Sequence, residues 1–510
     1  MVQTNQKFVL SPLAVVGFVG VLMAGELASG TDLYFVTMMA VAVLSACLTF
    51  NMLGGLGRMA GIGFIGFALG TLVISQVGKV VLFERADKNL DVPQLTITVY
   101  AVYYFSLMLG TFTFSRLRLP LPKPIEPETV AQSKYLYAIS LAGGVVGALG
   151  VVSLDLAGPE GATSLGHGFA RALAYLLPFS LVVAVDSRIR ATNGRHSLGW
   201  AALWPTLALM FIGFVEAGRI YFLEPFGIVL VTCYVRRYRF RRKHFAAAAG
   251  FVAAFFFIVS PFYLYARAWR GDATIRMQAA TMLRVLEGAP SQWGTIVSTV
   301  GEQALAGHGT VNYFDSPGAV TVNRFALIGP DSTLINACST GFHYGFTALR
   351  MDVLSQIPRF IYPNKPAMGS NEYLGHLDGQ ESDVFETTNS TITTVSDSYG
   401  AFGWVGVVVF PFLVVPAIFV VYESMFDFRR PWGTVAMATL LGGLSGGGMG
   451  LKLVDLMIKE PIYLLVISWC TAWCVRMIPA TGDRATGLRQ YDGSWVDTGE
   501  VEGHPSGAAL

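Results

Sequence analysis

Charge is what this sequence has little of. Lys, Arg, Asp and Glu together make up 13% of its 510 residues, whereas hydrophobic residues make up 53%. A soluble globular domain carries about 25% charged residues, and the mean hydropathy of +0.53 is far above that of such a domain. The composition therefore excludes a water-soluble enzyme.

Cysteine is also scarce, with five residues in the chain. Four of them fall in apolar runs, and only Cys338 lies in a long polar stretch, so a disulfide framework outside the cell is excluded. Cys470 and Cys474 share a helix face at a spacing of four residues, without a histidine or carboxylate nearby. We interpret both as small apolar packing residues rather than metal ligands.

Apolar runs of about 20 residues are what the sequence has in abundance. They fall near residues 8–28, 33–54, 59–83, 93–114, 135–157, 167–187, 197–216, 219–235, 244–266, 399–422, 433–456 and 460–478. Single runs cannot close a barrel, and lipid offers no partner to a backbone polar group, so each run is expected to be a helix. The predicted fold is an all-α polytopic membrane protein with about 12 transmembrane helices.

The runs divide the chain into four parts. Residues 1–266 hold the first nine spans, 267–398 form one large, partly helical extracytoplasmic loop, 399–478 hold the last three spans, and 479–510 form a disordered cytoplasmic tail. Counting connections alternately from a cytoplasmic N-terminus collects 20 of the 35 basic residues on one side, with the densest run at 236–243. Because cytoplasmic loops carry an excess of Lys and Arg, both termini are expected in the cytoplasm.

The stretch 267–398 concentrates the polar chemistry of the chain. It holds eight basic residues, twelve acidic residues and three of the seven histidines. Long loops are usually functional. Apolar spacing predicts an amphipathic helix over 273–300, lying at the membrane interface, and a second helix over 336–357 that ends before Pro358.

Four motifs in this region carry a resemblance. They are NRF at 323–325, GFHYG at 341–345, IPRFIYPNKP at 357–366, and DSYGAFGWVG at 397–406, where the tenth span opens. Together they resemble the large extracytoplasmic loop of Wzy-type oligosaccharide repeat-unit polymerases, the bacterial O-antigen and exopolysaccharide polymerases.

The resemblance implies an activity and a location. Such an enzyme polymerises undecaprenyl-diphosphate-linked repeat units into a surface or exopolysaccharide at the outer face of the bacterial cytoplasmic (inner) membrane. Donor and acceptor are both lipid-linked oligosaccharides, and the implied reaction uses no metal ion or other cofactor. Membrane lipids are further expected partners. A polysaccharide chain-length regulator is a candidate protein partner. No nucleic acid is expected, because the basic run at 236–243 is explained by orientation beside anionic lipid.

Cations are needed in such a reaction, because no metal ion neutralises the diphosphate leaving group. Arg359 and Lys365 lie six residues apart among three prolines, and proline restricts both its own φ and the preceding residue, so a rigid bracket is expected. Arginine forms bidentate bonds with phosphate oxygens. We predict that four residues bind the diphosphate: Arg359, Lys365, Arg324 and Arg219. For Arg359 and Arg324, the alternative role is to anchor the loop to lipid phosphates.

An acceptor hydroxyl also needs a general base. His343 is the first candidate, because an imidazole can take and release a proton near neutral pH; a solvated or structural role is its alternative. Glu372 and Asp397 are rivals, and Asp397 could instead pair with Arg359.

Sugar contacts are expected from aromatic faces in the loop. The candidates are Tyr344, Tyr362 and Tyr373, although tyrosine gathers at membrane interfaces for other reasons as well. Among charges within the spans, Lys452 and Asp455 are expected to neutralise each other at a spacing of three residues.

Two other classes of protein fit parts of the pattern. An O-antigen ligase shares the implied chemistry and topology. A 12-helix transporter or lipid-linked oligosaccharide flippase shares the span count, but no long cytoplasmic connection divides this chain into two six-span halves, as repeats would require.

Overall fold

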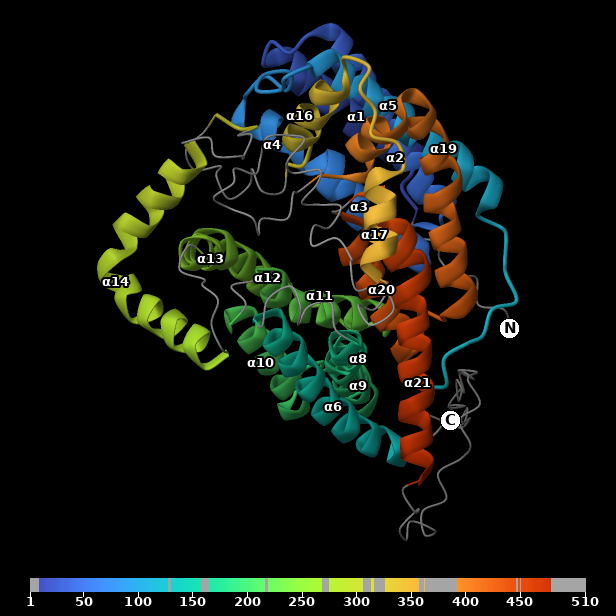
Figure 1. The fold of residues 1–510 in the computed structure, drawn as a ribbon, viewed down its shortest axis with the longest axis vertical. Helices are drawn as coiled ribbons and strands as arrows, with labels where there is room; N and C mark the ends of the chain where they lie inside the picture. The colour runs from blue at the N-terminus through green and yellow to red at the C-terminus, as the bar shows by residue number, and fades with distance from the viewer. Residues whose placement is uncertain are drawn as a thin grey trace, which may run out of the picture.

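A computed structural model gives the architecture of the chain (Figure 1). It describes residues 9–126, 130–156, 165–215, 219–267, 275–305, 313–315, 326–356, 362, 392–445, 448–449 and 451–477. Within these ranges the regular elements are all helical and no strand is present. The predicted all-α class is confirmed.

Six helical segments of the described chain are long and apolar enough to cross a membrane. They are Leu33–Gly57, Met59–Leu82, Pro93–Phe114, Lys134–Leu154, Gly168–Ala191 and Thr394–Met425. Shorter apolar helices cover Pro12–Ala28, Trp200–Val215 and Phe222–Val235. Helix is present in each of the twelve predicted runs, but several of these helices are short or interrupted.

The N-terminal helices begin at residues suited to start a helix. Ser11 caps the first helix, accepting from the N–H of Ala14 at 3.1 Å, and Asp32 caps the second in the same way through Phe35. The elements are α1 (Pro12–Ala28), α2 (Leu33–Met52), η1 (Gly55–Gly57), α3 (Met59–Ala68), η2 (Leu69–Val73), α4 (Ile74–Leu82) and α5 (Pro93–Phe114).

A second group of helices follows. It comprises α6 (Val130–Leu156), α8 (Leu165–Ala174), α9 (Leu176–Ala191), α10 (Trp200–Val215), α11 (Arg219–Val235), α12 (Arg242–Ala254), η3 (Phe255–Val259) and α13 (Ser260–Arg267). Figure 1 shows this group apart from the N-terminal helices, with α14 (Ile275–Leu305) curving along one edge. A small apolar cluster of Phe262, Ala289 and Ile296 joins α13 to α14.

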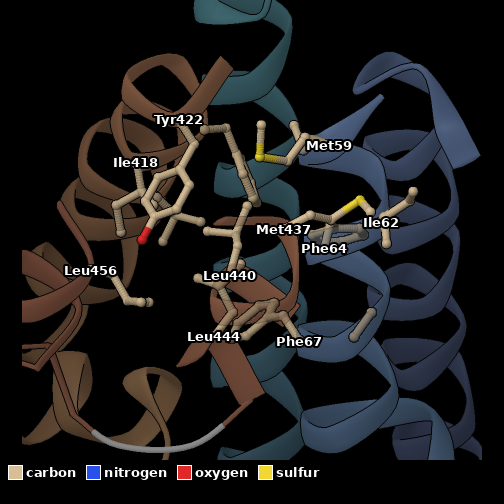
Figure 2. Packing of buried hydrophobic residues seen from close by; sticks show 14 of the residues in the cluster. Met59, Ile62, Phe64, Phe67, Ile418, Tyr422, Met437, Leu440, Leu444 and Leu456 are labelled. Atoms are coloured by element: carbon tan, nitrogen blue, oxygen red, sulfur yellow. The ribbon is translucent and has the colours of Figure 1, made fainter. Parts of the chain in front are cut away.

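The remaining elements complete the core. They are α16 (Ile328–Cys338), α17 (Thr347–Gln356), α19 (Thr394–Met425), α20 (Pro431–Ser445), η5 (Leu451–Lys459) and α21 (Glu460–Met477). Helix α5 packs between α2 and α19. Its Gly110 allows a close approach, because a Cβ there would lie 2.1 Å from the carbonyl oxygen of Phe412. Figure 2 shows Phe64 and Phe67 of α3 beside Leu440 of α20 in the same core.

The structure corrects two predicted boundaries. The helix expected over 336–357 is two helices, α16 and α17, separated by a connection at 339–346. The last two spans were predicted to be separated near residues 457–459, but η5 and α21 continue without a break from Leu451 to Met477 and α20 already ends at Ser445. Lys459 therefore lies within a helix rather than in a connection.

The π-helical segment η5 holds Lys452, Asp455 and Lys459. Asp455 bonds Lys459 at 3.3 Å, four residues along the same helix, and the ammonium of Lys452 donates to the carbonyl of Gly443. The pairing of Lys452 with Asp455 stays a prediction.

The predicted helix over 273–300 is confirmed as α14. Its place relative to a membrane stays a prediction.

Candidate functional site

The connection between α16 and α17 folds against the first part of α19. The N–H of Tyr344 donates to the carbonyl of Gly400 at 3.2 Å, and the N–H of Gly345 donates to that of Ala401 at 3.0 Å. Those carbonyls precede a kink in α19, where Phe402 and Gly403 leave the helical conformation. Because the helical ladder is interrupted there, the two carbonyls accept from the connection.

Tyr344 and Asp397 form a buried pair beneath this contact. The Tyr344 hydroxyl donates to Asp397 Oδ1 at 2.5 Å, and Asp397 Oδ2 accepts from the backbone N–H of Met449. The side chains of Tyr344 and Asp397 are almost completely buried. One carboxylate thus joins the α16–α17 connection, the start of α19 and residues 448–449.

His343 has the opposite environment to its neighbour Tyr344. Its side chain is exposed, and its ring lies edge-on to Tyr399 with the centroids 5.8 Å apart. The ring also approaches the kink, since a Cβ on Gly403 would lie 2.9 Å from His343 Nε2. An exposed imidazole supported on one side can exchange protons with a bound hydroxyl.

Three exposed aromatic side chains near His343 were not among the predicted sugar contacts. Tyr344 is buried, whereas Phe342, Phe346 and Trp404 are exposed by 52%, 68% and 44%. These three could not be recognised from the sequence, because phenylalanine and tryptophan in an apolar chain resemble membrane-facing residues. The alternation around His343, with aromatics at 342, 344 and 346, was the available signal.

Asp331 of α16 is a buried carboxylate that was not among the predicted site residues. It accepts from the hydroxyls of Tyr100, Thr393 and Ser396 at 2.5, 2.5 and 2.6 Å, and from the N–H of Thr393 at 2.9 Å. Burial raises the pKa of Asp331, and these hydrogen bonds oppose the rise. The network ties α16 to α5 and to the start of α19.

A further contact fixes residues 313–315 to the turn between α4 and α5. The carboxylate of Asp315 accepts from Lys88 and Asn89, each at 2.9 Å, and the Tyr313 hydroxyl donates to the carbonyl of Ala86 at 2.8 Å. The bonds from Asn89 and Lys88 lower the pKa of Asp315. The ammonium of Lys79 lies 4.5 Å from the centroid of the Tyr313 ring.

The structure brings together three of the predicted site residues: His343, Tyr344 and Asp397. Tyr362 is half-buried, and the residues on either side of it lie outside the described ranges. Arg219 is the first residue of α11, and its side chain is not described. The other predicted residues, Arg324, Arg359, Lys365, Glu372 and Tyr373, lie outside the described residues. Within the described part of the chain, no cluster of three or more His, Cys, Asp or Glu side chains could hold a metal ion.

The fold and the site together define a helical protein whose apolar helices are suited to a membrane, with a polar junction at the start of one long helix. Comparison of the chain with protein-family models, with curated proteins and with solved structures gives no match.

Proposed function

We propose that the protein is a membrane glycosyltransferase that polymerises undecaprenyl-diphosphate-linked repeat units into a surface or exopolysaccharide. In this proposal twelve spans cross the bacterial cytoplasmic membrane, both termini are cytoplasmic, and residues 267–398 face outward. Six long apolar helical segments, and helix in each predicted run, support the topology.

One observation carries the proposal. Two motifs that resemble the polymerase family, at 341–345 and 397–406, are far apart in the sequence yet bond to each other through Tyr344, Gly345 and Asp397. Contact between motifs identified separately is expected if both belong to one site.

The proposed reaction transfers a growing glycan to the next lipid-linked unit. The acceptor hydroxyl attacks the anomeric carbon of the donor, a new glycosidic bond forms, and the bond from that carbon to the diphosphate breaks. The electron pair leaves with undecaprenyl diphosphate, and the hydroxyl proton passes to a general base. Arg359, Lys365, Arg324 and Arg219 are proposed to stabilise the charge that develops on the leaving group.

His343 is the proposed base, because it is exposed beside the junction. Asp397 is proposed to act as a positioning residue, since both of its carboxylate oxygens accept hydrogen bonds from other segments. Glu372 stays an alternative base. Phe342, Phe346 and Trp404 are proposed to contact sugar faces, and Tyr362 and Tyr373 keep the same proposed role.

Deletion of the gene, followed by sizing of the surface glycan, tests the proposal. A polymerase predicts single repeat units in place of long chains, with restoration by the wild-type gene. Loss of all surface glycan would indicate a flippase, and accumulation of unattached long polymer would indicate a ligase; either outcome would overturn the proposal.

A further inference from the structure

The carboxylate of Asp331 fixes the residue at which α19 begins. Thr393 is the N-cap of α19, and its hydroxyl accepts from the N–H of Val395 at 3.1 Å. A hydroxyl has one proton to donate, and Thr393 donates it to Asp331 Oδ2 at 2.5 Å. Asp331 Oδ1 accepts from the Thr393 N–H at 2.9 Å and from the hydroxyl of Ser396 at 2.6 Å. The carboxylate therefore orients both the cap and the first turn of α19.

Helix α5 holds this carboxylate and the start of α16 in place. The hydroxyl of Tyr100 donates to Asp331 Oδ2 at 2.5 Å, and the hydroxyl of Thr96 donates to that of Ser332 at 3.0 Å. All four side chains are fully buried, so water does not compete for these hydrogen bonds. The first turn of α16 is thus fixed to α5 and to the start of α19 at the same point.

The segment that carries His343 is consequently attached at both ends to one turn of α19. Asp331 holds the beginning of this segment, and the hydrogen bond from Tyr344 to Asp397 holds its end. The backbone N–H of Asp397 donates to the carbonyl of Thr393 at 3.1 Å, so the two attachment points belong to the same helical turn. A shift at the Asp331 end would move α16, and with it the ring of His343, relative to α19.

We infer that Asp331 is a positioning residue of the proposed site. The inference rests on the proposed function, in which His343 accepts the proton of the acceptor hydroxyl. Asp331 is fully buried and does not itself reach a substrate; by holding α16 against α19, it fixes the position of the imidazole relative to the kink in α19. A misplacement of about 1 Å can cost about 100-fold in rate, so a residue remote from the reacting atoms can control the transfer.

Two substitutions weaken this attachment, and a matched substitution leaves it intact. Tyr100→Phe removes one donor to Asp331, and Asp331→Asn removes the negative charge that its four donors share. Tyr104→Phe is the control, because Tyr104 lies one turn further along α5, is equally buried and bonds Thr71 instead. Each tyrosine variant loses one buried hydrogen bond, so both are expected to lower Tm by a similar amount.

The full-length variants are compared with the wild-type protein in proteoliposomes supplied with lipid-linked repeat units. Initial rates of chain growth at increasing substrate concentration give kcat and KM. Tyr100→Phe and Asp331→Asn are expected to lower kcat about tenfold and to leave KM nearly unchanged, whereas Tyr104→Phe keeps the wild-type kcat. A merely structural role of Asp331 would instead reduce the rates of the two tyrosine variants equally.

Hydrogen exchange of a peptide covering 339–346 gives a second readout, which does not depend on activity. Its amides at Tyr344 and Gly345 donate to α19, so exchange there is expected to rise in Tyr100→Phe and not in Tyr104→Phe. If the wild-type protein forms no chains, the proposed function is wrong, and hydrogen exchange alone decides whether Asp331 positions the connection. The inference is overturned if Tyr100→Phe matches Tyr104→Phe in kcat or in exchange, or if Tyr100→Phe changes KM alone.

Discussion

The neighbouring residues His343 and Tyr344 have different roles in the proposed site. Tyr344 is buried and bonds Asp397, and this contact holds the exposed His343 beside the kink of α19. All three residues lie in the motifs at 341–345 and 397–406. The sequence could not assign Tyr344 to the interior, because its burial depends on a carboxylate 53 residues away.

Tyr344→Phe is predicted to lower stability and to reduce polymerisation. It removes the only side-chain donor that the described residues supply to Asp397 Oδ1, at a cost of about 1–3 kcal/mol. Tyr34→Phe is the matched control, since that exposed hydroxyl bonds Thr98 at the surface. Thermal denaturation of both purified variants is the measurement, and equal Tm values would show that the buried bond contributes no more than the exposed one.

Glu126, between α5 and α6, provides a prediction about pH. Its Oε2 atom is buried without a hydrogen-bond partner among the described residues, and burial raises the pKa of the carboxyl from 4.5 to about 8. Between these values the unfolded chain has released the proton while the folded chain still holds it, so the contribution of Glu126 to stability falls as pH rises through this window.

Glu126→Gln removes that titration. The Tm of the variant minus the Tm of the wild-type protein is therefore expected to increase from pH 5 to pH 8. Denaturation scans across this range measure the difference, and a difference that does not change with pH would contradict the raised pKa.

Among the helices, α19 is the element on which the proposed site depends. Gly403 has φ of 58° and ψ of −142°, a conformation that residues with a Cβ rarely adopt, and it creates the kink that lets the α16–α17 connection bond Gly400 and Ala401. Gly341 and Gly345, also at positive φ, lie in that connection.

Gly403→Ala is predicted to destabilise the protein by about 1–3 kcal/mol and to release the connection at 339–346. The added Cβ would lie 2.9 Å from His343 Nε2 as well as strain the backbone. Gly17→Ala in α1 is the control, because a Cβ there meets open space. Hydrogen exchange of a peptide covering 339–346 should increase in the first variant only, and unchanged protection there would contradict the role of the kink.

The helices themselves could be predicted from hydrophobicity, and their interruptions could not. Every predicted run contains helix, because about 20 apolar residues satisfy their backbone internally. The break at 339–346 was missed although Gly341 and Gly345 mark it, since the bonds that stabilise it come from α19. The end of α20 at Ser445 falls in a run with six glycines among residues 442–450.

For the whole molecule, hydrogen bonds among the described residues join parts of the stretch 267–398 to the turn before α5, to α5 and to one another. Asp315 bonds the turn before α5, Asp331 bonds α5 and the start of α19, and Tyr344 bonds Asp397. None of these contacts could be predicted from spacing, because each joins residues at least 53 positions apart.

The proposed orientation makes a prediction for intact cells. In a cysteine-free background, Ser339→Cys is expected to react with a membrane-impermeant maleimide from outside, and His196→Cys only after permeabilisation. Both positions are exposed. The reverse pattern, or reaction of both from outside, would contradict the topology.

Polymerisation by the purified protein tests the central claim most directly. Lipid-linked material extracted from the deletion strain would be supplied to proteoliposomes holding the wild-type protein, without nucleotide sugars, and the glycan products would be sized. The account predicts chains of two or more repeat units, with loss of chain growth in Arg359→Ala and His343→Ala protein reconstituted in equal amount. Glycan that stays at one repeat unit with the wild-type protein would contradict it.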